Sequence, residues 1–223
     1  MKKILMTVIA LAMCNMLMAQ WKMGVSVGYD YNQYDYDTQW AYRLHYGSRG
    51  GFTSEIPVTY SFNNWFKIAT GIAYVEKGFF VGYWSDSPGN RIEDLERRDY
   101  HLTLPLSAEF SFGGDRLRGS VSVGGYVSYW MVSYFNGYVL SMGNSVESVH
   151  EKMVFDPNVD NRFELGLMGG LGISYQFNED WTGTIGAKYY YALTDQHKDY
   201  QRLRFPSYNR TFVFQVGLIY NIK

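Results

Sequence analysis

The chain has 223 residues and a formal net charge of −1, with 20 Lys and Arg against 21 Asp and Glu. These charges are not concentrated into a basic face, so nothing indicates binding to a nucleic acid. Aromatic residues make up 18% of the chain, and 23 glycines accompany only 5 prolines, a composition that favours an all-β protein.

The N-terminus has the pattern of a secretory signal peptide. Lys2 and Lys3 precede a mostly apolar run over residues 4–17, and Ala19 is a small residue suited to cleavage. The run is shorter than the ~20 apolar residues that a membrane-spanning helix needs, so we expect cleavage rather than an anchor helix. The sequence therefore predicts a signal peptide over residues 1–19 and an exported protein.

The mature chain, residues 20–223, is expected to form a single domain without a thiol. The only cysteine, Cys14, lies in the signal segment, which excludes disulfides, Cys-ligated zinc and thiol catalysis after cleavage. Loss of Lys2 and Lys3 changes the formal charge from −1 to −3, because two positive charges are removed.

Eight segments of the mature chain alternate apolar and polar residues with a period of two, the pattern of a β-strand. They cover residues 21–31, 51–62, 65–77, 99–112, 117–131, 162–177, 181–193 and 210–222. Three connections are short and rich in turn residues: 63–64, 113–116 and 178–180. The other four are long and polar: 32–50, 78–98, 132–161 and 194–209. Short connections at one rim and long ones at the other are typical of a bacterial outer-membrane barrel.

One face of each predicted strand is apolar throughout. In the fourth segment, for example, Leu102, Leu104 and Leu106 alternate with His101 and Thr103. The eight apolar faces contain no Asp, Glu, Lys or Arg. Such an omission is expected where a face meets lipid, because Lys or Arg near the bilayer midplane costs about 2–4 kcal/mol.

Aromatic residues gather at both ends of the apolar faces. Near the short connections are Trp21, Phe62, Trp65, Phe66, Phe112, Phe177, Trp181 and Tyr220. Near the long connections are Tyr29, Tyr74, Tyr100, Tyr129, Phe163, Tyr189, Tyr191 and Phe212. Two such belts are the interface anchors of a membrane barrel.

The alternative is a soluble carrier of the lipocalin type, which would place its apolar residues around a ligand cavity. Here the opposite face consists mainly of Gly, Ser and Thr, which is too polar for such a cavity. We therefore predict an all-β fold: an eight-stranded antiparallel up-and-down transmembrane β-barrel in the cell outer membrane, with short periplasmic turns and long extracellular loops.

Several strand motifs follow one another in a recognisable order. They are Gly71-Ile72-Ala73-Tyr74 leading to Lys77-Gly78, Tyr100-His101-Leu102-Thr103-Leu104-Pro105-Leu106 running into Glu109-Phe110-Ser111-Phe112, Arg118-Gly119-Ser120-Val121 leading to Gly124-Gly125-Tyr126-Val127, and the closing segment from Phe214 to Ile222. In this order they resemble the PorT-like outer-membrane β-barrel family, among the porin-family proteins of Gram-negative bacteria. The resemblance implies a fold and a location and assigns no activity.

The last predicted strand resembles a signal for barrel assembly. The segment from Gln215 to Ile222 follows the pattern polar-x-Gly-x-x-aromatic-x-hydrophobic, in which Gly217 and Tyr220 take the fixed positions. Signals of this form are read by the barrel-insertion machinery, which we expect to be a partner during assembly. Incidental alternation within a strand is the other explanation of the pattern.

Charged residues also occur on the face that points into the barrel. They are Glu55, Lys67, Glu109, Arg118, Glu164 and Lys188, three acids and three bases. Eight strands enclose a space that side chains can fill, and charges buried there require partners. We therefore predict a plugged interior with an ion-pair network, in which Glu109 lies between Lys67 and Arg118. A narrow channel for ions or small solutes is the alternative.

The long connections are expected to meet anionic lipid and other surfaces. Their basic residues are Arg97, Arg98, Lys198, Arg202, Arg204 and Arg210, which are suited to the phosphates of lipopolysaccharide. Their many Tyr and Trp side chains suit contact with an extracellular protein or a glycan. Packing at the barrel rim also explains many of these aromatic residues.

No set of residues predicts catalysis, a cofactor or a metal. The nearest pair of a base and a nucleophile on one strand is His101 and Ser107, and six residues along a strand separate them by about 20 Å. We therefore expect a non-enzymatic barrel whose function lies in structure or surface interaction. A narrow channel is the first alternative and a soluble carrier the second.

Overall fold

The computed structural model describes residues 20–36, 44–84, 91–140, 146–198 and 207–222. The predicted signal peptide over residues 1–19 lies outside these ranges. The described residues form nine strands: β1 (Gln20–Tyr36), β2 (Leu44–Ser61), β3 (Phe66–Trp84), β4 (Arg91–Gly113), β5 (Leu117–Leu140), β6 (Val146–Lys152), β7 (Phe163–Gln176), β8 (Trp181–Ala192) and β9 (Ser207–Ile222). No helix in the described ranges is long and apolar enough to span a membrane.

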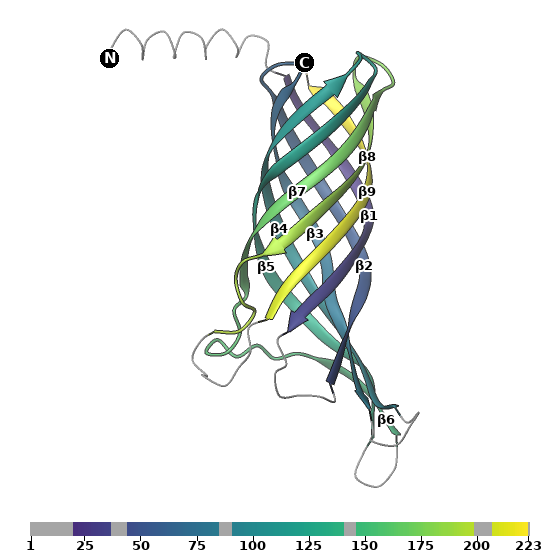
Figure 1. Cartoon of the computed structure of the whole chain (residues 1–223), viewed down its shortest axis with the longest axis vertical. Coiled ribbons are helices and arrows are strands. Elements are labelled where there is room, and N and C mark those ends of the chain that lie inside the picture. Colours follow the sequence, from purple (N-terminus) through teal and green to yellow (C-terminus); the bar gives the residue numbers. More distant parts are fainter. Residues whose placement is uncertain (1–19, 37–43, 85–90, 141–145, 199–206, 223) are drawn as a thin grey trace, which may run out of the picture.

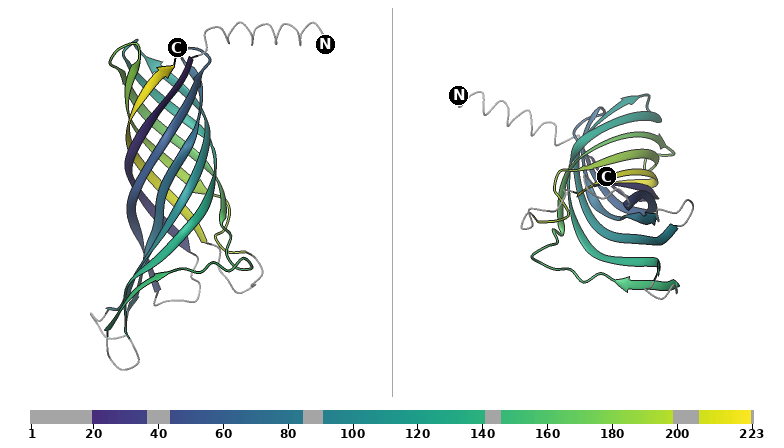
Figure 2. Two further views of the ribbon diagram at one scale, coloured as in Figure 1. Left: turned by 180° about the vertical axis from the view of Figure 1, so that it is seen from behind. Right: turned by 60° about the horizontal axis from the view of Figure 1, so that its bottom comes forward.

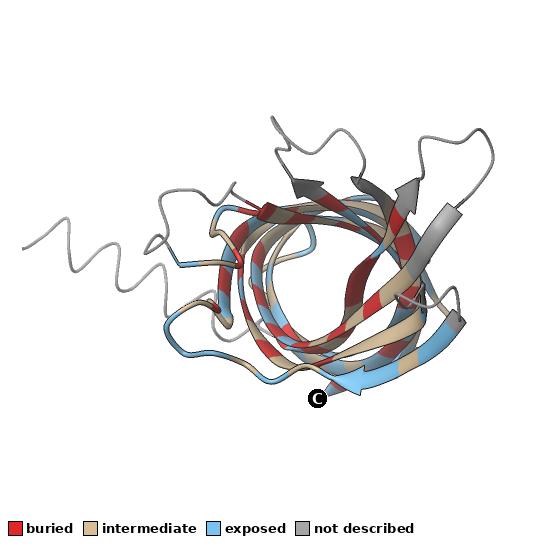
Figure 3. Ribbon diagram, turned by 90° about the horizontal axis from the view of Figure 1, so that it is seen from below, coloured by how far each residue is buried: buried red, intermediate tan, exposed pale blue. Residues whose placement is uncertain are grey.

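Eight of these strands form one closed antiparallel barrel. Strands that follow one another in sequence pair together, with one exception. β6 pairs only with the end of β5, and β7 pairs with the rest of β5 instead of with β6. β1 pairs with both β2 and β9, and this double pairing closes the ring. Figure 1 and Figure 2 show the tilted strands, and Figure 3 shows the ring from the end of the long connections. The predicted eight-stranded barrel is confirmed.

The apolar faces of the strands point outward around the whole barrel. Leu106, Val123, Leu171 and Ile185 are each 60 to 66% exposed, although they belong to the most apolar residue types of the chain. Aromatic pairs across neighbouring strands mark both ends of this surface. Such a surface is stable only where lipid covers it.

The two aromatic belts are visible as ring contacts between strands. At the short-connection end, ring centroids lie 4.9 Å apart for Trp21 and Tyr60, and 5.1 Å apart for Trp181 and Tyr220. At the long-connection end the corresponding pairs are Tyr74 with Tyr100 at 6.0 Å, Tyr129 with Phe163 at 5.1 Å, and Tyr189 with Phe212 at 5.8 Å.

The short connections are held by local hydrogen bonds. The side-chain oxygen of Asn63 accepts hydrogen bonds from the backbone amides of Trp65 and Phe66. Asn178 makes the same arrangement, because its side-chain oxygen accepts from the amides of Asp180 and Trp181. An Asn side chain that bonds to the backbone two or three residues ahead stabilises a tight turn.

The long connections differ from the sequence-based prediction. β4 begins at Arg91 rather than 99, β5 continues to Leu140 rather than 131, and a further strand, β6, pairs with the end of β5. Strands β3 to β6 therefore extend past the outer aromatic belt as a sheet, and β6 lies at its far end in Figure 1. The sequence pattern missed these extensions because neither face meets lipid there, so apolar and polar residues need not alternate.

Candidate functional site

The interior of the barrel divides into two parts of different character. The half near the short connections contains a cavity of about 830 Å³, which we call the vestibule. The half near the long connections is filled by buried polar side chains, which we call the plug: Asn32, Lys77, Tyr126, Glu164, Asn209 and Thr211, each at most 4% exposed. An apolar cluster of Tyr126, Met168, Tyr190 and Val213 lies at the same level and adds to the barrier.

Two ion pairs line the wall of the vestibule. The ammonium group of Lys67 lies 2.9 Å from a carboxylate oxygen of Glu109, and that of Lys188 lies 2.5 Å from Glu55. Lys67 and Glu109 are direct neighbours on β3 and β4, whereas Lys188 on β8 reaches across the lumen to β2. Four of the six charged residues predicted for the lumen thus lie in two pairs.

The other two predicted lumen residues have different partners from those expected. Arg118 donates hydrogen bonds to the backbone carbonyl oxygens of Asn64 and Gly114 in the turns, and it forms no ion pair with Glu109. Glu164 forms an ion pair with Lys77, a residue that was not among the charges predicted for the lumen. Glu109 therefore has one cation in contact rather than the expected two.

Glu164 is the centre of the plug. One of its carboxylate oxygens accepts from Lys77 and from the hydroxyl of Tyr126, which lies 2.7 Å away, and the other accepts from the side-chain amide of Asn209 at 2.7 Å. Glu164 is 4% exposed and Lys77 is 1% exposed. A buried charge pair of this kind is stable because each charge is both neutralised and hydrogen-bonded.

Asn32, on β1, joins the plug to β3 and β9. Its side-chain amide donates to the carbonyl oxygen of Gly78 at 2.9 Å and to the side-chain oxygen of Asn209 at 3.2 Å, and its own oxygen accepts from the hydroxyl of Thr211 at 2.6 Å. Gly78 has a φ angle of +140°, and a Cβ atom there would lie 2.0 Å from the carbonyl oxygen of Arg97. Only glycine fits this approach of β3 to β4.

A second buried cluster lies further out, at the mouth of the barrel. The guanidinium group of Arg97 is placed between the rings of Phe79 and Trp130, at 5.1 and 4.4 Å from their centroids. It donates to Asp99 at 2.8 Å and to Gln196 at 3.4 Å. Arg97 is 5% exposed, so in this structure it does not lie at the surface where lipopolysaccharide was predicted to contact it.

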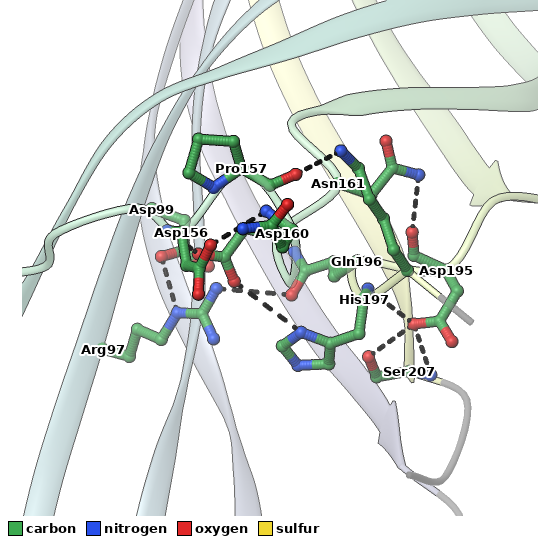
Figure 4. Close-up of polar contacts among 12 residues, drawn as sticks. Arg97, Asp99, Asp156, Pro157, Asp160, Asn161, Asp195, Gln196, His197 and Ser207 are labelled. Carbon is green, nitrogen blue, oxygen red and sulfur yellow. Dashed lines mark hydrogen bonds and ion pairs between the residues drawn. The ribbon is translucent and has the colours of Figure 1, made fainter. Parts of the chain in front are cut away.

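Two loop segments, residues 153–162 and 193–198, contact each other beside this cluster (Figure 4). The backbone amide of Asn161 donates to the carbonyl oxygen of Gln196, and the carboxylate of Asp195 accepts from the amide and the hydroxyl of Ser207. An imidazole nitrogen of His197 lies 3.8 Å from Asp160. These contacts join the β5–β7 connection to the β8–β9 connection.

The other residues predicted to meet lipopolysaccharide have different surroundings. Arg98 points outward beyond the outer belt, with 42% of its side chain exposed, and Arg210 stacks on the ring of Tyr191 at 4.5 Å. Lys198 is exposed and donates to the carbonyl oxygen of Pro157. Arg202 and Arg204 lie outside the described residues.

Outside the lipid-facing segment, Glu96 joins two arginines. Its carboxylate accepts from Arg49 at 2.6 Å and from Arg98 at 2.9 Å. Burial alone would raise the pKa of Glu96, but the hydrogen bonds from Arg98 and Arg49 outweigh burial and hold this pKa below its ordinary value. The bond from Arg49 ties β2 to β4 beyond the outer aromatic belt, whereas the bond from Arg98 lies within β4.

His101 does not form a catalytic arrangement. Its ring stacks on Trp130 with centroids 6.1 Å apart, and its Nδ1 atom lies 3.3 Å from the hydroxyl of Ser128 on the neighbouring strand. His101 and Ser128 are at most 1% exposed, so a substrate has no access to them. In the described part of the chain, no three His, Cys, Asp or Glu side chains are grouped to hold a metal ion.

A family model for the outer membrane protein beta-barrel domain matches residues 16–198. Among solved structures, the outer membrane protease OmpT of Escherichia coli is similar over 91% of this chain and 97% of its own, with a TM-score of 0.51 and 10% identity. A major outer membrane protein of Thermus thermophilus is similar over 92% and 99%, with a TM-score of 0.50 and 12% identity. OprG of Pseudomonas aeruginosa is similar over 92% of this chain and 95% of its own, with a TM-score of 0.49 and 12% identity. No curated protein matches the chain by sequence.

Proposed function

The chain belongs to the family of the outer membrane protein beta-barrel domain, and on this premise we propose that it is a non-enzymatic barrel, closed to solutes, whose extracellular sheet binds a protein or a glycan. The observation that carries this proposal is the extension of β3, β4, β5 and β6 beyond the outer aromatic belt. A sheet held by backbone hydrogen bonds presents its side chains in fixed positions, which suits recognition more than a mobile loop does.

The plug supports a closed barrel. Glu164, Lys77 and Asn209 are at most 4% exposed, so neither side of the membrane supplies water to them. An ion that crossed this level would have to break the Glu164–Lys77 pair and leave both charges without partners, which is costly in a medium of low dielectric constant.

Binding is tested with the extracellular sheet shortened. Residues 137–149 are replaced by Asn-Gly, which joins β5 to the last residues of β6 through a hairpin turn. Cells that display the wild-type barrel are expected to bind members of a panel of immobilised glycans and glycoproteins, and cells with the shortened variant are expected to lose this binding. Equal amounts of folded barrel are verified by the shift in gel mobility on boiling. Equal binding by both cell types would contradict the proposal.

A narrow channel is the second candidate, and the vestibule favours it because half of a path through the membrane is already open. Conductance across a planar bilayer distinguishes the two. We expect the wild-type barrel to be silent, and Glu164→Ala together with Lys77→Ala to open a measurable current. A wild-type current that disappears in Glu109→Ala, with the barrel intact, would favour the channel.

The finer assignments are proposals on the same footing. The motif order from Gly71 to Val127 supports membership of the PorT-like family, and the N-terminal pattern supports export with cleavage after Ala19. Sequencing the N-terminus of the protein isolated from outer membranes tests the second point: Gln20 is expected as the first residue. Barrel-insertion machinery is the proposed partner during assembly.

Lipopolysaccharide remains a proposed partner at the outer belt. Arg98 and Arg210 point outward next to Tyr100 and Tyr191, which is the level of lipid phosphates. Replacing both arginines by Gln is expected to weaken the retention of lipopolysaccharide on the purified barrel, whereas Arg97→Gln is expected to leave this retention unchanged. Unchanged retention in the double variant would contradict the proposal.

A further inference from the structure

The vestibule is reached from the periplasmic end of the barrel. Its lining includes the turn residues Asn63, Asn64 and Arg116, so the cavity extends to the rim. The strands around it are joined by continuous backbone pairing, for example from Gln20 to Met23 along β2 and from Phe66 to Thr70 along β4. A ligand therefore enters along the barrel axis and not sideways between strands.

Positive charge exceeds negative charge in the part of the vestibule next to the turns. The basic residues of this part are Lys22, Lys67, Arg116 and Arg118, and its acidic residues are Glu109, Asp115 and Glu179. Glu109 is already paired with Lys67. The second ion pair, Lys188 with Glu55, neutralises itself further inside. The four basic and three acidic residues beside the turns therefore leave an excess of one positive charge.

Lys22 and Arg118 form no ion pair with an acidic residue among the described residues. The ammonium group of Lys22 forms no hydrogen bond or ion pair with a described residue, although the side chain is half-buried. Arg118 is fixed by its hydrogen bonds to the carbonyl oxygens of Asn64 and Gly114, and its buried Nε atom has no described partner. Buried donors normally have acceptors, so the Nε atom of Arg118 is available to donate to an anion in the cavity.

The surrounding wall supplies further donors of the right kind. Hydroxyl groups of Thr59, Ser61, Ser120 and Ser174 line the same cavity, and they are able to donate to anionic oxygens. A metal cation would be repelled by the basic residues of this part.

We propose that the vestibule binds a small solute with a phosphate or sulfate group from the periplasmic side, held by Lys22, Lys67 and Arg118. An arginine fixed by its environment and a flexible lysine together suit a tetrahedral anion, because the guanidinium sets the orientation and the ammonium adapts. This site does not depend on the extracellular sheet, and it requires no passage through the plug.

The experiment titrates pyrophosphate into the mature barrel, folded in the uncharged detergent dodecyl maltoside, by isothermal titration calorimetry. Saturable binding is expected, weaker by about tenfold in Lys22→Gln and by more in Lys22→Gln with Arg118→Gln. Lys152→Gln is the matched control, because it removes one positive charge from an exposed residue of β6 at the other end of the barrel. Its affinity is expected to equal that of the wild type. Added salt is expected to weaken binding, since the attraction is electrostatic.

Three results would overturn the proposal. One is the absence of saturable pyrophosphate binding by a wild-type barrel whose gel mobility shifts on boiling and which is therefore folded. Another is equal affinity in wild type and Lys22→Gln, a substitution that breaks no described contact and so keeps the test independent of folding. The third is binding to vesicles of phosphatidylglycerol without binding to soluble pyrophosphate, which would assign the site to a lipid headgroup.

Discussion

The two halves of the lumen use charged residues in different ways. In the vestibule, the side chains of Lys67 and Glu109 keep 15 and 22% of their surface exposed, so both water and protein groups solvate their charges. In the plug, Lys77 and Glu164 keep 2 and 5%, so each depends on protein partners alone. An ion pair therefore blocks the lumen of a barrel only where hydrogen bonds from the protein replace all the water around both charges.

The largest expected difference between the halves is in access to water. Ser122 lines the vestibule, whereas Ser128 in the closed half is 0% exposed. A mature chain that starts at Gln20 has no cysteine, so one introduced thiol is the only thiol present. Ser122→Cys is expected to react with a charged maleimide at least about a hundred times faster than Ser128→Cys, because the latter must wait for local opening. Similar rates, measured by mass spectrometry, would mean that the plug is open.

Loss of a carboxylate should lower the free energy of unfolding more in the plug than in the vestibule. Glu164→Gln leaves the buried ammonium of Lys77 without a counter-charge, and we expect a loss of about 3–5 kcal/mol in the free energy of unfolding. Glu109→Gln, in the vestibule, is expected to cost about 1 kcal/mol or less because its pair is partly solvated. Urea titrations of the barrel in lipid vesicles measure both. The double variant Glu164→Gln with Lys77→Met should recover most of the loss, and no recovery would mean that the pair is not the cause.

Removal of a single hydrogen bond to the Glu164 carboxylate tests the plug more finely. Tyr126→Phe deletes only the hydroxyl that donates to Glu164 at 2.7 Å, and the free energy of unfolding is expected to fall by about 1–3 kcal/mol. Tyr190→Phe is the matched control in the same apolar cluster, because no hydrogen bond of its hydroxyl joins the plug. Its effect should be smaller. Equal losses in urea titrations of the two variants would assign the effect to packing.

The sequence predicted the barrel well because lipid imposes a strict pattern. A side chain such as Leu106 or Val123 must be apolar where it meets lipid, so the period of two and the count of strands are visible in the chain. No similar rule governs the lumen. Lys77 and Glu164 lie 87 residues apart on strands that are not paired, and their contact depends on the tilt and stagger of the closed barrel. Sequence spacing does not contain that information.

Residues beyond the lipid were partly predictable. Arg97 and Arg98 are neighbours on a strand and so point to opposite sides, and Arg97 shares its side with Asp99 and His101, which are buried. This alternation would have distinguished Arg97 from Arg98 if the predicted strand had begun before residue 99, where β4 does begin. The signal that was overlooked is thus the continuation of a strand after its apolar face has ended.

The smallest expected effect concerns the extracellular sheet, where Glu96 bonds to Arg49 and Arg98. Because the folded pKa of Glu96 lies below its ordinary value of 4.5, its contribution is fully present above pH 4.5 and is lost as the pH falls through the folded pKa. With 42% of the Arg98 side chain exposed, the contribution is about 0.5–1 kcal/mol. Hydrogen-exchange protection of the amides of Phe80 and Arg98 should fall by that amount under acid, whereas protection of the amides in β7 should not.

Glu96→Gln distinguishes this cause from other acidic groups of the same sheet. The variant should show the reduced protection of the extracellular amides already at neutral pH and little further change under acid. If acid lowers protection equally in wild type and Glu96→Gln, a different carboxylate, such as Glu76 at 3.5 Å from Arg49, controls the sheet. Either way, the barrel between the belts should keep its protection, because its hydrogen bonds lie in lipid and do not depend on these charges.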